Sequence, residues 1–338
     1  MSNESIKVAV VGLGYWGPNL VRNFIQTDGG EVTRVCDIVP ERCARMQKLY
    51  PWVKATNRYE EILQAKDVDA VAIATPPSEH YAMARAALEL GKHVLVAKPM
   101  TETMKDALEL VAFSEKVHQI LMVDHTFAYS SSVRMLKQFM SNNTLGDIYF
   151  FDSVRVNPWL SITKPHISVI RDLAAHDISI MVYLFDSVPK VTSIIAKDDG
   201  SGLIGLAYIS LDVNDRVLGH IFVNRLSPLK IRRTMLGGSK GLVLYDDTET
   251  SDKVKLYEQS FQFNAFEEDP HTPTNRLGGV YIPVLEAREP LQVEAQHFVD
   301  SILRQTLPIT GGEFGLKVVQ VLTRCEELAQ AQLQGGHS

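Results

Sequence analysis

The first 125 residues alternate strand-like runs with amphipathic helical segments, and this alternation limits the fold more than any other feature of the sequence. The strand-like runs are residues 6–12, 31–37, 68–75, 93–97 and 120–124. Several of them are apolar almost throughout and rich in β-branched residues, which is typical of strands buried on both faces of a sheet. Repeated strand–helix alternation predicts a parallel sheet with helices on both faces.

The pattern changes after about residue 126. A helix is expected at 131–140, followed by longer strand-like runs joined by Gly, Asp and Ser turns, which is typical of antiparallel strands. A segment rich in proline and glycine, 268–283, is interpreted as an extended loop. Two amphipathic helices are expected at about 288–305 and 312–333.

The length of 338 residues suits two domains, which we place at 1–125 and 126–338, with the C-terminal helix expected to pack back on the first. The net charge of −6 argues against nucleic-acid binding, and no apolar run reaches the roughly 20 residues of a membrane span. Three cysteines in no metal-like spacing, and a start without signal-peptide architecture, suit the reducing cytoplasm. We therefore expect a cytoplasmic protein. The histidines form no ligand cluster, so we expect no metal site.

A glycine-rich loop follows the first strand-like run. GLGYWG matches G-x-G-x-x-G and opens a helix, so its backbone N–H groups are expected to hold the pyrophosphate of a dinucleotide. The loop residues predicted to contact the cofactor are Gly12, Gly14, Tyr15, Trp16 and Gly17. Asp37 lies twenty residues after Gly17, where its carboxylate can accept hydrogen bonds from both adenosine ribose hydroxyls. This carboxylate would repel a 2′-phosphate and so favours NAD over NADP, although Arg42 leaves NADP open. The alternative interpretation of the glycine loop is a turn whose glycines bind no ligand.

Residues that follow the third and fourth strand-like runs should also face the cofactor, because ligands of doubly wound sheets bind at the carboxyl ends of the strands. These residues are Thr75, Pro76, His80, Ala97 and Lys98. The alternative for ATPPSEH is a turn that ends a strand, with Ser78 as a helix N-cap. The alternative for Lys98 is a surface lysine at a turn.

The stretches VAVVGLGYWGPNLVRNF, ATPPSEH and VLVAKPM occur in the order and spacing of the Gfo/Idh/MocA oxidoreductases, and the chain resembles that family over nearly its whole length. GYWGPNLVRNF, DLAAHDISIM and GGSKGLVLYDD most resemble the branch acting on nucleotide-linked N-acetylamino sugars. The resemblance implies an α/β Rossmann domain followed by an α+β domain with a large, mostly antiparallel open sheet. It also implies a homodimer or homotetramer formed through that sheet.

One departure from the family concerns VLVAKPM. Relatives carry Glu-Lys-Pro where this chain has Ala97-Lys98-Pro99. The family glutamate lies near the nicotinamide, so its loss could change cofactor affinity, the pKa of Lys98 or the rate of catalysis.

Oxidation of a secondary alcohol needs a base for the hydroxyl proton while hydride passes to nicotinamide. Asp172 and His176 lie four apart in RDLAAHDISIMVYLF, so on a helix they share one face. The resemblance makes His176 the general base, Asp172 its partner and Lys98 a third catalytic residue. The alternatives are an N-capping Asp172 and a core His176, and Asp177 is interpreted as structural.

Four residues are predicted to contact the substrate: Arg155, Asn157, His125 and Tyr129. Arginines bind the diphosphate of a nucleotide sugar well, and Arg225, Arg232 and Arg233 are further candidates against the alternative of surface charges.

The leading hypothesis is an NAD(P)-dependent dehydrogenase that oxidises a ring hydroxyl of a sugar, at C3 of a nucleotide-linked amino sugar. One alternative is a keto-sugar reductase of deoxysugar or antibiotic assembly. The others are a non-redox NAD-binding sensor or regulator and an NAD-assisted glycosidase.

Overall fold

The computed structural model describes residues 5–158, 167–263 and 273–335, and these form two compact units. Unit 1 comprises Met1–Tyr129 and Arg288–Gln320, and unit 2 comprises Ser130–Ala287 and Val321–Ser338. The first unit therefore takes a second segment from near the end of the chain, whereas the sequence suggested a boundary at residue 126 with only the C-terminal helix packed back on the first domain.

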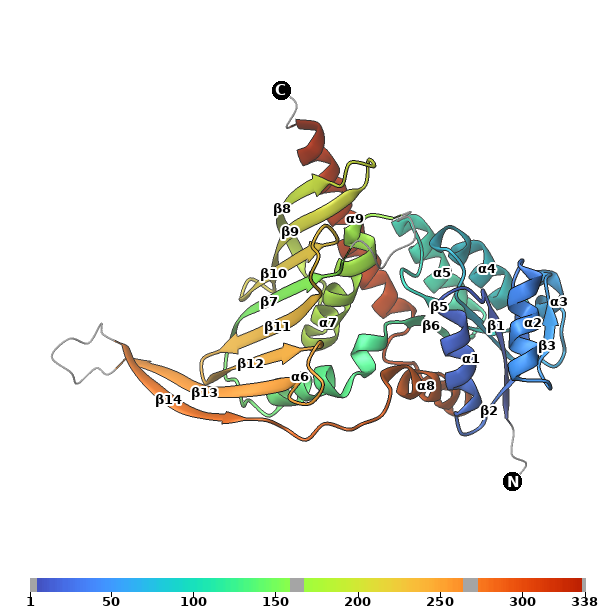
Figure 1. Cartoon of the computed structure of the whole chain (residues 1–338), viewed down its shortest axis with the longest axis horizontal. Helices are drawn as coiled ribbons and strands as arrows, with labels where there is room; N and C mark the ends of the chain where they lie inside the picture. The colour runs from blue at the N-terminus through green and yellow to red at the C-terminus, as the bar shows by residue number, and fades with distance from the viewer. Residues whose placement is uncertain (1–4, 159–166, 264–272, 336–338) are drawn as a thin grey trace. The chain divides into compact units, whose positions relative to one another are not determined.

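Unit 1 is built on a six-stranded sheet in the order β3-β2-β1-β4-β5-β6, and every strand pair in it is parallel (Figure 1). Its strands are β1 (Ile6–Val11), β2 (Gly30–Cys36), β3 (Lys54–Thr56), β4 (Ala70–Ile73), β5 (His93–Ala97) and β6 (Leu121–Asp124). The connecting helices are α1 (Gly17–Ile25), α2 (Pro40–Leu49), α3 (Tyr59–Leu63), α4 (Pro77–Glu89), α5 (Met104–Lys116) and the 3₁₀ turn η1 (Thr126–Tyr129). The strand order reverses beside β1, which creates the crevice where such sheets bind ligands.

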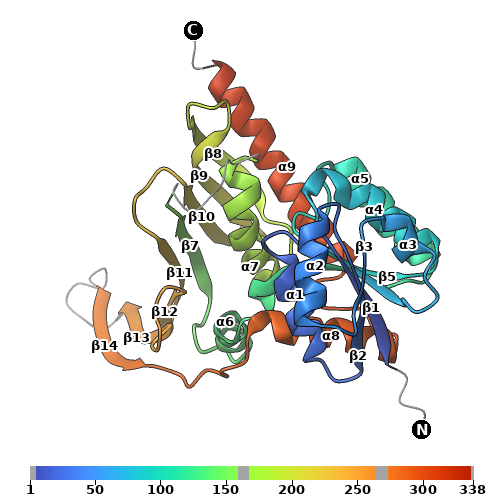
Figure 2. The same cartoon turned by 45° about the vertical axis from the view of Figure 1, so that its right-hand side comes forward.

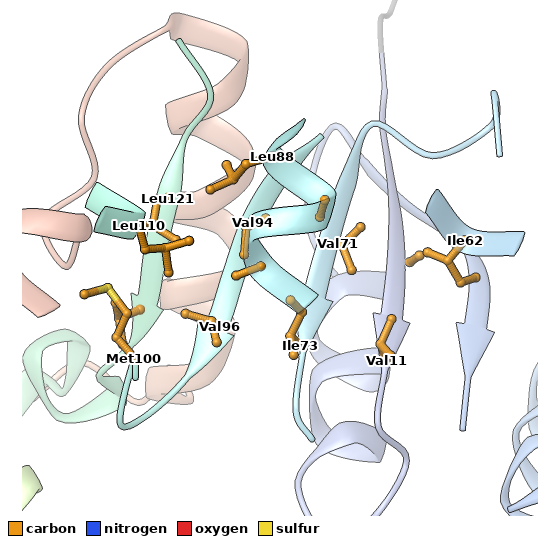
Figure 3. Packing of buried hydrophobic residues seen from close by; sticks show 14 of the residues in the cluster. Val11, Ile62, Val71, Ile73, Leu88, Val94, Val96, Met100, Leu110 and Leu121 are labelled. Atoms are coloured by element: carbon orange, nitrogen blue, oxygen red, sulfur yellow. The ribbon is translucent and has the colours of Figure 1, made fainter. Parts of the chain in front are cut away.

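One face of this sheet packs against α3, α4 and α5. The side chains of Val11, Val71 and Val94 on the strands meet Ile62 and Leu88 from the helices, and all five are fully or almost fully buried (Figure 3). These apolar runs read as strands in the sequence because both faces of the sheet are covered.

The second segment of unit 1 supplies α8 (Pro290–Arg304) and the start of α9 (Gly312–Gly335). Helix α8 lies beside α1, where the rings of Phe24 and Phe298 meet edge to face at 6.1 Å (Figure 2). At the entry to α9, the backbone N–H of Val123 in β6 donates to the carbonyl of Thr310 at 2.8 Å. Residues 288–320 thus complete both a helical layer and the sheet edge of unit 1.

Unit 2 is built on an eight-stranded sheet in the order β14-β13-β12-β11-β7-β10-β9-β8. All of its strand pairs are antiparallel except β7 with β10. Its strands are β7 (Ile148–Val156), β8 (Lys190–Asp198), β9 (Ile204–Val213), β10 (Val217–Asn224), β11 (Ile231–Gly238), β12 (Gly241–Asp246), β13 (Val254–Phe263) and β14 (Pro273–Tyr281). The helices of unit 2 are α6 (Ser131–Ser141), the π-helical turn η3 (Ile170–Ala174), α7 (Ala175–Phe185) and the part of α9 from Val321 onward.

Helix α7 covers one face of the eight-stranded sheet (Figures 1 and 2). The methyl group of Met181 lies where Gly219 of β10 leaves space, so the helix approaches the sheet closely. Asp177 of α7 reaches Ser153 and Arg155 of β7. The strands alternate buried and partly exposed residues, which leaves the opposite face of the sheet open in unit 2.

Two sequence interpretations differ from the structure. Residues 273–281 of the segment expected to be an extended loop form β14, while 268–272 lie outside the described residues. Strand β14 is the last strand of the sheet and begins with its proline, a position where strands accept this residue. The three-residue strand β3 was missed because so short a run carries no periodicity.

Among the described helices, none is long and apolar enough to cross a membrane.

Candidate dinucleotide site and catalytic residues

The glycine loop joins β1 to α1 in a conformation that only glycine tolerates at two positions. Gly12 has a φ of 87°, and a Cβ there would lie 2.6 Å from the carbonyl carbon of Ala74. A Cβ on Gly17 would lie 1.9 Å from the carbonyl oxygen of Gly12. By contrast, a Cβ on Gly14 would meet nothing within 4 Å, so the backbone is open to a ligand at this point. The loop leads into a helix whose N-terminus has no side-chain cap, which suits a pyrophosphate.

Asp37 is buried at the end of β2 and ties this strand to the glycine loop. Its Oδ2 accepts the backbone N–H of Leu13 at 2.6 Å, and its Oδ1 accepts that of Val39 at 2.8 Å. The guanidinium of Arg42 lies 3.3 Å from Oδ2. Arg42 Nη1 also lies 3.4 Å from Oδ1, so all four acceptor positions of the carboxylate have a partner, and the two long Arg42 contacts are those that ribose hydroxyls would replace.

The turn after β4 is held to the turn after β5 through His80. This side chain is buried, with Nδ1 2.8 Å from the carbonyl oxygen of Pro99 and Nε2 2.8 Å from that of Thr75. Burial lowers the pKa of His80. A neutral imidazole has one N–H, so His80 donates to one of these two carbonyl groups at a time while it lies between the two loops at the ligand edge of the sheet.

Lys98 follows β5 at the same edge, and the Lys98–Pro99 peptide is cis. Its side chain is half-buried. His125, which follows β6, is buried, and burial together with the nearby Lys98 ammonium lowers the pKa of His125 to about 3. The His125 ring is tilted against Phe314 at 5.3 Å. A cationic lysine thus lies close to a neutral imidazole at the carboxyl ends of β5 and β6.

Trp16 and Tyr129 both make contacts inside unit 1. The indole Nε1–H of Trp16 donates to Asp124 at the end of β6. Tyr129 is buried, its hydroxyl pairs with Thr310 Oγ1 at 3.2 Å, and burial raises its pKa. The Tyr129 hydroxyl is therefore engaged within the core of unit 1. Sequence reasoning missed Asp124, although its place at the end of the last parallel strand was a usable signal.

In unit 2, Asp172 lies in the π-helical turn η3 and His176 in the first turn of α7. The sequence suggested one regular helix through both. Asp172 caps neither helical segment, since the N-cap positions are Val169 and Ala174, and His176 is half-buried rather than enclosed in the core. Single π-helical turns occur frequently at functional sites.

Arg155 is almost completely buried against α7. Its Nε donates to Asp177 Oδ2 at 2.7 Å and its Nη2 to Oδ1 at 3.0 Å, and Ser153 Oγ donates to Oδ1 at 2.6 Å. The side chains of Arg155 and Asp177 are 3% and 1% exposed, so water does not reach this ion pair.

The other predicted arginines differ in exposure. Arg225 is 1% exposed, and burial lowers its pKa while the nearby carboxylates of Asp172 and Asp199 oppose that change. Arg232 is partly exposed, pairs with Asp247 at 3.1 Å and donates to Asn157 Oδ1 at 3.4 Å. Arg233 pairs with Asp246 at 2.6 Å and is the most exposed of the three. Within the described residues, no group of histidine, cysteine and acidic side chains has the arrangement of a metal site.

Unit 1 therefore has the features of a dinucleotide-binding α/β fold: a glycine loop at the strand-order reversal, a buried acid after the next strand, and polar residues along one sheet edge. The chain belongs to the GFO/IDH/MocA oxidoreductase family. Residues 6–125 match its NAD-binding Rossmann-fold domain, and residues 133–244 match its C-terminal domain. The predictions of family, fold class and NAD as cofactor are confirmed.

Known relatives are similar over different lengths. The uncharacterized oxidoreductase YdgJ of Escherichia coli is 28% identical over 202 residues, a match that spans 58% of this chain and 58% of the relative. The solved UDP-N-acetylglucosamine 3-dehydrogenase GnnA of Acidithiobacillus ferrooxidans aligns with a TM-score of 0.81 at 21% identity, over 97% of this chain and 99% of that one. The scyllo-inositol dehydrogenase of Lactobacillus casei, solved with NAD(H) and scyllo-inositol, gives a TM-score of 0.78 at 19% identity over 97% of each chain. These structural likenesses establish the shared fold.

Proposed function

We propose that the chain is an NAD-dependent dehydrogenase that oxidises a ring secondary alcohol of a sugar. The observation that carries this proposal is the line of groups at the carboxyl edge of the parallel sheet. The glycine loop follows β1, Asp37 follows β2 and Lys98 follows β5, in a chain of an oxidoreductase family.

Bound NAD supplies the hydride acceptor for this reaction. We assign the hydroxyl proton to His176, whose partly exposed imidazole can take up a proton near neutral pH. Asp172 orients His176 or the substrate, and Lys98 holds the reacting oxygen with its ammonium group. Two observations support these roles: Asp172 caps no helix, and His176 is not enclosed in the core.

We further propose a nucleotide-linked amino sugar as substrate, oxidised at C3. The GnnA structure named above is that of a UDP-N-acetylglucosamine 3-dehydrogenase, and the sequence stretches around Trp16 and Asp172 point to the same branch. Arg232 and Asn157 are our candidates for the diphosphate, since they lie together and are partly exposed. Arg155 and Arg225 are buried, so we assign them to holding Asp177 and Asp172 rather than to the substrate.

The test is absorbance near 340 nm when purified protein, NAD and a panel of UDP-sugars are mixed, with NADH and keto-sugars in the reverse direction. Lys98→Met should lower turnover at least a hundredfold while NAD still binds, and Lys105→Met, an exposed lysine of the same unit, should change neither. Absence of turnover in both directions with bound NAD would favour a non-redox sensor. Unchanged turnover of Lys98→Met would remove Lys98 from the mechanism.

The open face of the eight-stranded sheet supports a homo-oligomer in solution. Ile195, Tyr208 and Leu218 are 65%, 43% and 69% exposed there, and Tyr208 stacks on Phe222 at 4.3 Å. In register Ile195, Tyr208 and Phe222 share one row across β8, β9 and β10. Leu218 lies two rows away on β10, beyond the row that contains His220 and Asp152. An exposed apolar surface of this kind marks an interface. Light scattering should show a dimer or tetramer that Leu218→Asp dissociates, and a monomeric wild-type protein contradicts the proposal.

A further inference from the structure

A pair of buried carboxyl groups lies at the last strand of the parallel sheet. Asp124 ends β6 and is 4% exposed. It accepts the indole N–H of Trp16 from the glycine loop, and its Oδ1 accepts the hydroxyl of Thr126 at 2.6 Å. In the sheet register it stands opposite Ala97, the residue before Lys98. A carboxylate is therefore present one strand away from the position where the chain carries a methyl group.

Glu294 of α8 lies against Asp124 and is fully buried. Its contacts with Thr126 and with the backbone N–H of His125 favour the ionised carboxylate, and its hydrogen bond with Asp124 opposes ionisation. Burial and the neighbouring Asp124 charge raise the pKa of Glu294 well above its usual value. The raised pKa of Glu294 favours its protonated form, which can donate a hydrogen bond to Asp124.

Other titratable groups around Glu294 come from the adjoining turn and from α8 itself. Tyr129 has its pKa raised by burial and by Glu294, and burial lowers the pKa values of His125 and His297. Within this cluster, Asp124 is the carboxyl group that is joined to the glycine loop, through the indole N–H of Trp16.

The strand order fixes which half of the cofactor Asp124 can meet. The pyrophosphate belongs at the loop after β1, and the adenosine belongs at Asp37 after β2. Bound in this direction, the nicotinamide half would lie on the other side of β1, toward the carboxyl ends of β4, β5 and β6. The oxidised nicotinamide ring carries a positive charge, and the reduced ring is neutral.

We propose that Asp124, held by Trp16 and Glu294, is the carboxylate that favours oxidised over reduced nicotinamide in this protein. This inference rests on NAD binding at the proposed site and requires no particular sugar. It makes Asp124 a specificity-determining residue for the redox state of the cofactor, and Trp16 and Glu294 positioning residues. A negative charge attracts the oxidised ring and does little for the neutral one, so its contribution appears in the ratio of the two affinities.

The experiment is calorimetric titration of the full chain with NAD and with NADH. Asp124→Asn should weaken NAD binding about tenfold and change NADH binding less than twofold, as expected for one partly screened charge. A tenfold change in the ratio corresponds to about 30 mV in the two-electron potential of the bound cofactor. Asp69→Asn is the matched control, because Asp69 accepts the backbone N–H of Lys7 at 2.8 Å at the opposite edge of the same sheet. The control should leave both affinities unchanged.

Two further variants separate charge from structure. Trp16→Phe removes the donor and keeps the carboxylate, so it should weaken NAD and NADH equally. Glu294→Gln keeps a donor to Asp124 and should leave the ratio unchanged. If Asp124→Asn weakens both nucleotides equally, or if Glu294→Gln shifts the ratio, the assignment to Asp124 is wrong. Wild-type protein that binds neither nucleotide overturns the proposed function itself, and the two failures are thus distinguishable.

Discussion

Replacement of Asp177 by asparagine tests the structural reading of the buried ion pair in unit 2. The carboxylate receives Arg155 at 2.7 and 3.0 Å and Ser153 at 2.6 Å, with both charged side chains excluded from water. Removal of one partner leaves a buried guanidinium without its counter-charge, which costs about 3–5 kcal/mol. For a unit of this size, each kcal/mol lowers Tm by roughly 2–4 °C, so Asp177→Asn should lower Tm by roughly 6–20 °C.

The assay is thermal unfolding followed by circular dichroism, together with NAD binding. Glu327→Gln is the control, because Glu327 forms an exposed pair with Arg324 in the same unit, and exposed pairs contribute about 0–1 kcal/mol. The double replacement Arg155→Met with Asp177→Leu should recover much of the loss, since apolar residues of similar volume can replace a buried pair. If Asp177→Asn lowers Tm by less than about 2 °C while turnover collapses, the pair serves the reaction and our reasoning is refuted.

Three further predictions follow from unit 1. Gly14→Ala should fold normally, since its Cβ meets nothing within 4 Å, yet weaken NAD binding at least tenfold by calorimetry; unchanged affinity would mean that the cofactor does not approach Gly14. Because the folded state keeps His125 neutral down to a pKa of about 3 and the unfolded state protonates it near pH 6.5, stability falls as the pH drops through that window. The slope is about 1.4 kcal/mol per pH unit, and denaturant titrations of His125→Asn should show a shallower dependence; an equal slope excludes the residue. Burial raises the pKa values of Cys36 and Cys325 to about 12, so a thiol reagent should label neither in the native protein and all three cysteines after unfolding, and rapid native labelling contradicts their burial.

Much of the cofactor half could be predicted from sequence because its signals are local. The glycine loop, its helix and Asp37 lie within one strand–helix–strand unit, and each glycine has a steric reason that a motif captures. The strands of unit 1 are buried on both faces, so their composition alone identified them, apart from the three-residue β3.

Contacts between distant segments were not predictable in the same way. Glu294 sits in an ordinary amphipathic helix, and nothing in its neighbourhood indicates that it meets Asp124, 170 positions earlier. Arg155 was predicted to contact the substrate from its place at a strand end, and the sequence did not show that α7 brings Asp177 against it. The π-helical turn at Asp172 contains no proline or glycine, so the sequence carries no signal for this change of helical geometry. Contacts between residues far apart in the sequence depend on tertiary structure, and the local sequence pattern around either residue does not identify its partner.

Unit 1 consists of two segments that are far apart in the sequence, and this affects how it folds during translation. When the ribosome has released Tyr129, α8 and the start of α9 do not yet exist, so Phe24 lacks its aromatic partner and β6 lacks the backbone pairing from Thr310. At synthesis rates of about 5–20 residues per second, the missing segment follows on the order of ten seconds later, after all of the eight-stranded sheet. The second sheet therefore has its complete set of strands first, and the nucleotide-binding half must stay unaggregated with an uncovered apolar helix until the end of translation.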